Sequence, residues 1–150
     1  MIRLHQVKEA KQVGIIYHFT QSMSILKILK DRGFKTRHHD FISFTRNYDL
    51  RGDFGEFRFV LDGDKLSEHY RVEPFLDTEY KISRGAEERE ERVPWPKEKV
   101  LPVFNCILEL TVLRSGWKRL LTSIQDEVSI SYGNLGIPIH FVSSFTPFKR

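Results

Sequence analysis

Three short segments of this sequence carry side chains that could do chemistry together. The first is Tyr-His-Phe-Thr at residues 17–20, where a histidine stands near the end of a β-branched and aromatic run. A neutral imidazole can donate or accept a hydrogen bond at a ligand hydroxyl. A histidine on a half-buried strand is equally often satisfied by a neighbouring carbonyl, so His18 alone supports either interpretation.

The second segment is Ile-Ser-Phe-Thr-Arg-Asn at residues 42–47. In a strand, Ser43 and Thr45 share one face, opposite the two apolar side chains of the segment. That face could be wetted by solvent, or it could form the floor of a cleft with Arg46 at the strand end. An arginine suits a diphosphate there because its guanidinium is always charged and forms paired hydrogen bonds.

The third segment is Glu-Glu-Arg-Glu-Glu-Arg-Val, which begins at position 87. As a helix it would be a solvated face with salt bridges. A strand would divide its charged side chains between two faces, with Glu88, Glu90 and Arg92 on one and Glu87 and Glu91 on the other. Carboxylates two residues apart on one face repel each other. They fit a site where a cation or a developing positive charge lies beside them.

The composition predicts one α+β domain over residues 1–150. The chain has 40% hydrophobic and 29% charged residues and a net charge of +4, which excludes a collagen, a disulfide scaffold and a disordered chain. Residues 1–51 carry ten Lys/Arg against four Asp/Glu, a balance of +6, and the other 99 residues balance at −2. A basic first third with exposed Phe or Tyr nearby would suit a nucleic-acid partner, or only the diphosphate of a nucleotide.

No apolar stretch approaches the roughly 18 residues that a membrane span needs, and Met1 to Gln12 lacks the apolar core of a signal peptide. We therefore expect a soluble, cytoplasmic protein with no membrane partner. Cys106, the only cysteine, lies in an apolar run and is expected in the core. We expect no metal site at the adjacent His38 and His39, because neighbouring side chains on a strand point to opposite faces.

Hydrophobic periodicity predicts the elements that must position these side chains. The predicted strands cover residues 14–20, 41–46, 56–62, 70–75 and 137–143, with one long or two short strands within residues 100–113, while residues 87–93 could be a strand or a helix. One helix is expected to start at a Thr20 or Ser22 cap and to end before Gly33; another contains Trp117, Leu120, Leu121 and Ile124. A turn is expected at Asp62-Gly63. Strands outnumber helices without alternating with them, which favours a mostly antiparallel sheet with flanking helices.

In this order, YHFT, ISFTR, VLDGDKL and ExEERV resemble small ADP-ribosyltransferase-like proteins of phages and of bacterial toxin or defence loci, distantly related to the DarT group that ADP-ribosylates DNA. The resemblance spans residues 15–93. It implies a split, mostly antiparallel sheet and NAD as co-substrate. By the resemblance, His18 would hydrogen-bond a ribose hydroxyl of the adenosine half of NAD, with Phe19 and Thr20 beside it, and Ser43 and Thr45 would lie near the nicotinamide.

The resemblance also assigns the charged residues. Arg46, or less closely Arg51, would hold the diphosphate or the acceptor. Glu90 would be the catalytic carboxylate, because Arg-Val follow it as in the resembling sequences, and Glu88 would orient the acceptor. A frame shifted by two residues would make Glu88 catalytic.

The implied activity is the transfer of ADP-ribose from NAD to a macromolecule, with nucleic acid slightly favoured over protein, in a toxin, defence or phage–host conflict. It requires no metal and could involve an antitoxin or a host target as partner. Two alternatives remain open: a non-catalytic nucleic-acid- or protein-binding module on the same fold, and an NAD glycohydrolase.

Overall fold

Seven strands form one mixed sheet in the order β4-β5-β2-β1-β3-β6-β7. We describe a computed structural model, which covers residues 13–50, 55–74 and 90–149. The strands are β1 (Ile15–Thr20), β2 (Phe41–Thr45), β3 (Phe57–Asp62), β4 (Glu73–Pro74), β5 (Glu90–Pro94), β6 (Ile107–Leu113) and β7 (Ile139–Val142). Neighbouring strands are antiparallel except β6 and β7, which are parallel. The predicted α+β class with a mostly antiparallel sheet is therefore confirmed.

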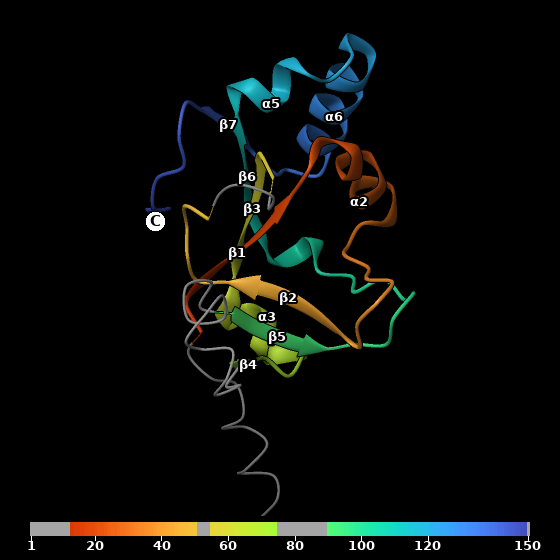
Figure 1. Ribbon diagram of the computed structural model, residues 1–150, viewed down its shortest axis with the longest axis vertical. Helices are drawn as coiled ribbons and strands as arrows, with labels where there is room; N and C mark the ends of the chain where they lie inside the picture. Colours follow the sequence, from red (N-terminus) through yellow and green to blue (C-terminus); the bar gives the residue numbers. More distant parts are fainter. Residues whose placement is uncertain (1–12, 51–54, 75–89, 150) are drawn as a thin grey trace, which may run out of the picture.

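The sheet is nearly divided between β1 and β2. These two strands share a single registered pair, Tyr17 with Thr45, whereas β1 and β3 share six pairs and β2 and β5 share five. In Figure 1, β2 and β5 run across the view while β3 and β6 run along its long axis. Because the strands diverge beyond the one shared pair, side chains from β1 and β2 can line a space between the two halves of the sheet.

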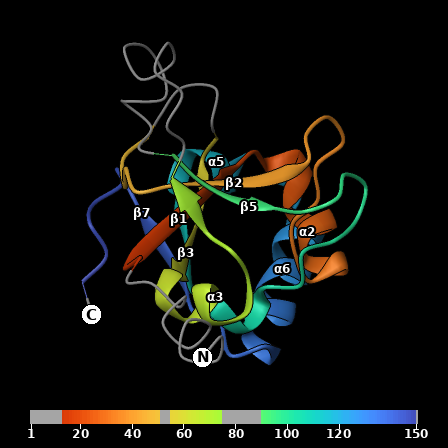
Figure 2. The same ribbon diagram turned by 90° about the horizontal axis from the view of Figure 1, so that it is seen from below.

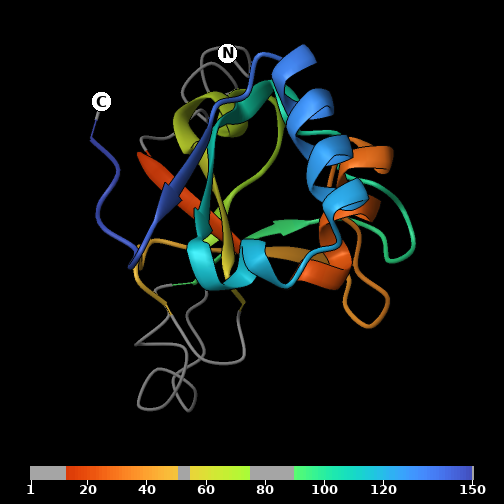
Figure 3. The same cartoon turned by 90° about the horizontal axis from the view of Figure 1, so that it is seen from above.

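Helices lie mainly on one side of β1, β3 and β6. The helices are α2 (Ile25–Asp31), α3 (Gly63–His69), α5 (Arg114–Lys118) and α6 (Thr122–Asn134), with 3-10 turns η1 (Ser22–Ser24) and η4 (Phe104–Cys106). Helices α2 and α6 pack against each other, and Figures 2 and 3 show them on the same flank of the molecule. The C-terminal segment after β7 runs along the opposite flank. No helix in the described part of the chain is long and apolar enough to cross a membrane.

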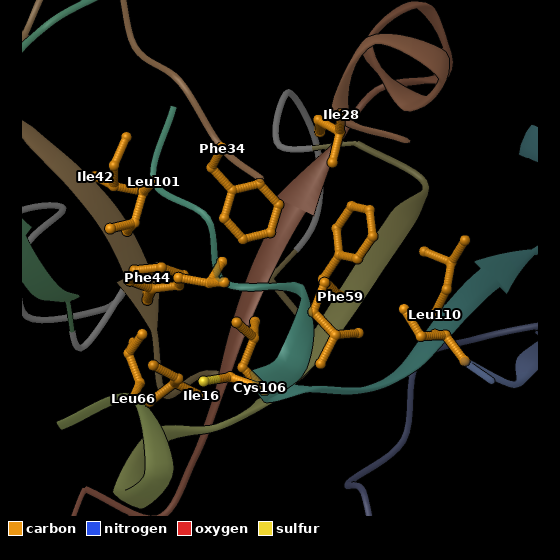
Figure 4. Packing of buried hydrophobic residues seen from close by; sticks show 14 of the residues in the cluster. Ile16, Ile28, Phe34, Ile42, Phe44, Phe59, Leu66, Leu101, Cys106 and Leu110 are labelled. Carbon is orange, nitrogen blue, oxygen red and sulfur yellow. The ribbon is translucent and has the colours of Figure 1, made fainter. Parts of the chain in front are cut away.

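The aromatic core lies between the sheet and these helices. Phe34 is 1% exposed and packs edge-on against Phe44 and Phe59, with ring centroids 5.9 and 5.3 Å apart (Figure 4). Edge-to-face contacts of this kind are favourable for aromatic quadrupoles. Cys106 is buried beside this core, as its apolar surroundings predicted.

Helix α2 begins later than its predicted cap. Thr20 is still part of β1, Ser22 lies in η1, and the residue before α2 is Ser24, with no side-chain cap hydrogen bond at either start. The predicted end is confirmed: Arg32 adopts the left-handed conformation, and the Gly33 amide donates to Ile28 O. Gly33 is required there because a Cβ would lie 2.1 Å from Leu101 O.

The turn predicted at Asp62-Gly63 is wrong. Asp62 accepts a hydrogen bond from the Lys65 amide at 3.1 Å and caps α3. The helix predicted around Trp117 to Ile124 is two helices, because α5 ends at Lys118 and the exposed Leu121, in an extended conformation, precedes the first residue of α6. Local periodicity does not distinguish a cap from a turn, because both use the same residue types.

Strand lengths also differ from the prediction. Of the described residues 70–74 only Glu73–Pro74 pairs, and of residues 100–113 only the last seven form a strand, β6. Leu101 makes an isolated bridge to Phe34 instead. Within the third chemical segment, Glu90–Pro94 is a strand, so a helix there is wrong. Glu87 and Glu88 lie outside the described residues.

Candidate active site between the two halves of the sheet

Two cavities meet at His18. The smaller, of about 180 Å³, lies where β1 and β2 diverge and is lined by Tyr17, His18 and Phe19 from β1, by residues 43–45 from β2 and by Leu50. The larger, of about 410 Å³, extends from His18 and Thr20 along α2 to residues 33–37. The larger cavity falls in the size range of small-molecule sites, about 300–1,000 Å³, and the smaller lies below it.

His18 is held by its neighbours in one orientation. Its ring is stacked on Phe34 with centroids 4.1 Å apart, and its Nδ1 lies 3.0 Å from the carbonyl oxygen of Ser43. A carbonyl can only accept, so Nδ1 carries the proton and donates. Burial lowers the pKa of His18 to about 4, and the bond to Ser43 opposes this only in part. At neutral pH the ring is therefore uncharged, with Nε2 as a hydrogen-bond acceptor.

Ser43 connects His18 to Glu90. Its carbonyl accepts from His18, and its hydroxyl donates to Glu90 Oε2 at 2.6 Å. Arg92 Nε lies 3.1 Å from the same carboxylate oxygen, and the Glu90 side chain is only 9% exposed. The register of β2 and β5, with Thr45 opposite Glu90, brings these groups together. Residues from two of the three chemical segments thus contact each other directly, and the first reaches them through His18.

Glu91 lies on the other face of β5. It is opposite Phe44, whose ring contacts His18 at 5.7 Å, and its Oε2 accepts from Arg46 Nε at 2.9 Å. The predicted separation of Glu90 and Glu91 onto opposite faces is confirmed. Arg46 is therefore engaged by a buried carboxylate, and it does not line either cavity.

The other predicted site residues are distributed between the two cavities. Phe19 and Thr45 line the smaller cavity, and Thr20 lines the larger. Arg51 and Glu88 lie outside the described residues. Among the described aromatic side chains only Tyr48 is exposed, at 37%, so the exposed Phe or Tyr considered for a nucleic-acid partner is limited to this one ring in the described part of the chain.

Three cations of the larger cavity were not singled out in the sequence. Lys27, Lys35 and Arg37 line it together with Asp31, which pairs with Lys27 at 3.5 Å. The only signal was the positive balance of the first 51 residues, which does not tell which lysine or arginine faces a cavity. These side chains give the larger cavity a positive rim.

No cluster of three metal-ligating side chains occurs among the described residues. His38 and His39 lie in an exposed loop before β2 rather than on a strand, and His39 stacks on Phe41 at 4.8 Å. No protein-family model matches the chain, and neither does any curated protein.

Proposed function

We propose that this protein is an NAD-dependent ADP-ribosyltransferase with an ADP-ribosyltransferase-like split sheet. The observation that carries the proposal is the chain of contacts from His18 through Ser43 to Glu90, placed at the gap where β1 and β2 diverge. His18 lines both cavities, whereas Glu90 lines neither and is connected to the smaller one through the hydroxyl of its lining residue Ser43. A neutral acceptor and a largely buried carboxylate joined in this way suit a substrate with ribose hydroxyls and a bond whose cleavage develops positive charge.

His18 serves as a hydrogen-bond acceptor for a ribose hydroxyl. Its Nδ1–H is committed to Ser43 O, which leaves Nε2 to accept, and its lowered pKa keeps it uncharged. An uncharged ring adds no positive charge near a substrate that already carries a cationic nicotinamide. His18 thus orients the substrate and does not act as a general acid.

Glu90 stabilises the reacting centre. The bond between ribose C1′ and the nicotinamide nitrogen breaks, the nitrogen keeps the electron pair, and positive charge develops on the ribose, as in other glycosyl transfers. A carboxylate that contacts the ribose 2′-hydroxyl interacts more strongly with that charge than with the ground state. The acceptor then forms a bond to C1′ and gives its proton to Glu90 or to Glu88 as general base.

The diphosphate is held at the positive rim of the larger cavity. Lys35 and Arg37 have the appropriate charge, and Lys27 is shared with Asp31. Arg46 pairs with Glu91 on the face of the sheet opposite to Glu90, so we do not assign it to the diphosphate, although its side chain is 42% exposed. We favour nucleic acid as the acceptor because the exposed Lys30 and Arg32 add positive charge at the C-terminal end of α2, where they line a separate cavity with Glu127.

An assay with NAD labelled in its adenylate half tests this proposal. The protein is incubated with labelled NAD and, in separate reactions, with single-stranded DNA, RNA and lysate proteins. Label in a macromolecule supports the transferase, and free ADP-ribose alone identifies an NAD glycohydrolase. Salt-sensitive nucleic-acid binding without any nicotinamide release identifies a non-catalytic binding module.

A further inference from the structure

Arg58 is buried on the face of β3 that points away from the aromatic core. It is 2% exposed, yet the three oxygens that accept its hydrogen bonds are all uncharged. Its Nη1 donates to Tyr48 O at 2.9 Å and to Thr146 O at 2.7 Å, and its Nη2 donates to Thr111 Oγ1 at 3.2 Å. A buried guanidinium is costly unless it is hydrogen-bonded, and the Nε of Arg58 has no partner among the described residues, so the three bonds made by Nη1 and Nη2 favour one geometry.

The two carbonyls bound by Nη1 come from segments far apart in the sequence. Tyr48 lies in the loop after β2, and Thr146 lies in the C-terminal segment, defined as residues 143–149. The guanidinium is also sandwiched between the rings of Tyr17 and Phe145, each centroid 5.0 Å from its carbon. Arg58 thus joins β1, the β2–β3 loop and the C-terminal segment at one point.

Each segment that Arg58 joins also contributes to the smaller cavity or contacts a residue that does. Tyr17 lines that cavity, and so does Leu50, two residues after Tyr48. Phe145 packs edge-on against Phe19, another lining residue, with centroids 5.2 Å apart. Arg58 therefore contacts one lining residue, Tyr17, directly, and it holds segments that contain or contact two others, Leu50 and Phe19.

Close packing does not by itself hold the C-terminal segment in place. A separate cavity of about 730 Å³ lies beneath it, lined by Glu109, His140 and Phe148 among others. The segment is fixed by the Arg58 bond to Thr146, by the Phe145 ring and by the long contact from the Phe148 amide to Tyr17 Oη at 3.5 Å. Loss of these few contacts would release both the segment and the loop.

We propose that Arg58 is a positioning residue, which clamps residues 47–50 after β2 and the C-terminal segment so that Tyr17, Phe19 and Leu50 keep the shape of the smaller cavity. The effect on turnover rests on the proposed function, because this cavity would take the substrate. The effect on the loop does not, because it follows from the hydrogen bonds alone.

Two full-length variants remove the clamp from opposite sides. Arg58→Met deletes the guanidinium, and Phe145→Ala deletes one of the rings that contact it. Arg58→Lys keeps a positive charge and a hydrogen-bond donor at this position. Pro147→Ala, which changes an exposed residue of the C-terminal segment, is the control. Hydrogen exchange is followed at the amides of residues 47–50 and of α6 at a temperature where each variant is folded. We expect exchange at residues 47–50 to accelerate at least about tenfold in Phe145→Ala and Arg58→Met, less in Arg58→Lys, and not in α6.

In the labelled-NAD assay, the same variants should raise KM for NAD several-fold with kcat within about twofold, because the cavity is misshapen while Glu90 is untouched. Unchanged exchange at residues 47–50 in folded Phe145→Ala overturns the clamp, whatever the activity. A wild-type protein without any NAD turnover contradicts the proposed function but leaves the exchange result to decide the clamp. If Arg58→Met does not fold, Phe145→Ala and Arg58→Lys decide it.

Discussion

The hydroxyl of Ser43 donates to Glu90 Oε2 at 2.6 Å, while the carbonyl of the same serine accepts from His18. One residue of β2 therefore fixes an imidazole from one half of the sheet and a carboxylate from the other. This arrangement depends on the single pair that joins β1 to β2, since closer pairing would close the gap.

Glu90→Gln should lower the rate of ADP-ribose transfer by about 10²-fold or more, because an amide cannot stabilise the developing positive charge. Glu91→Gln should keep most of its turnover but lose stability, because it weakens the buried pair with Arg46. Glu98→Gln, at an exposed position, serves as control. Initial rates of nicotinamide release and thermal unfolding measure both effects. The reverse result, with Glu91→Gln inactive and Glu90→Gln active, would move the catalytic role to Glu91.

His18 should make the free energy of unfolding depend on pH. Its pKa is about 4 in the folded protein against 6.5 for the free side chain, so the unfolded chain binds the proton more readily. The stability from the neutral ring is fully present above pH 6.5 and is lost as the pH falls toward 4, up to about 3 kcal/mol. Urea unfolding at pH 7.5 and pH 5 should show this loss in the wild type and in His140→Gln, and a smaller loss in His18→Gln. Equal losses in all three proteins would contradict the protonation state assigned to His18.

Lys35→Ala combined with Arg37→Ala should raise KM for NAD about tenfold or more and leave kcat nearly unchanged, because charges on the diphosphate contribute to binding in ground and transition state alike. The wild-type KM should also rise with salt, and more steeply than that of the double variant. Lys118→Ala, on α5 away from the cavity, is the matched control. Steady-state kinetics at two salt concentrations give KM for NAD in each protein. If the double variant has the KM of the wild type, the diphosphate binds at other residues.

Two glycine substitutions should have opposite effects on stability. Gly33→Ala puts a Cβ 2.1 Å from the backbone oxygen of Leu101 and should cost about 1–3 kcal/mol or more. Gly133→Ala, in α6 with no atom within 4 Å of the added Cβ, should stabilise the protein by about 0.5–1 kcal/mol. Denaturant unfolding of both variants against the wild type measures the difference. A neutral Gly33→Ala would mean that residues 33 and 101 are farther apart than described here.

The sequence by itself determined the features that depend on local repeats. A two-residue period placed Phe57, Phe59 and Leu61 on the core face of β3, and it separated Glu90 from Glu91 on β5. The helical spacing of Ile25, Ile28 and Leu29 with Gly33 beyond them identified α2 and its end. These features can be predicted from the sequence because the periods of strands and helices depend on backbone geometry within a few consecutive residues.

Only the tertiary structure decided which of these elements meet. The gap between β1 and β2, the burial of Arg58 and the exposure of Lys35 and Arg37 to a cavity all depend on contacts between residues far apart in the chain. Asp62 similarly became a helix cap because Gly63 packs against Gly14 O, where its amide donates at 2.8 Å. Strand pairing and burial are set by such long-range contacts, which a local pattern of residue types does not encode.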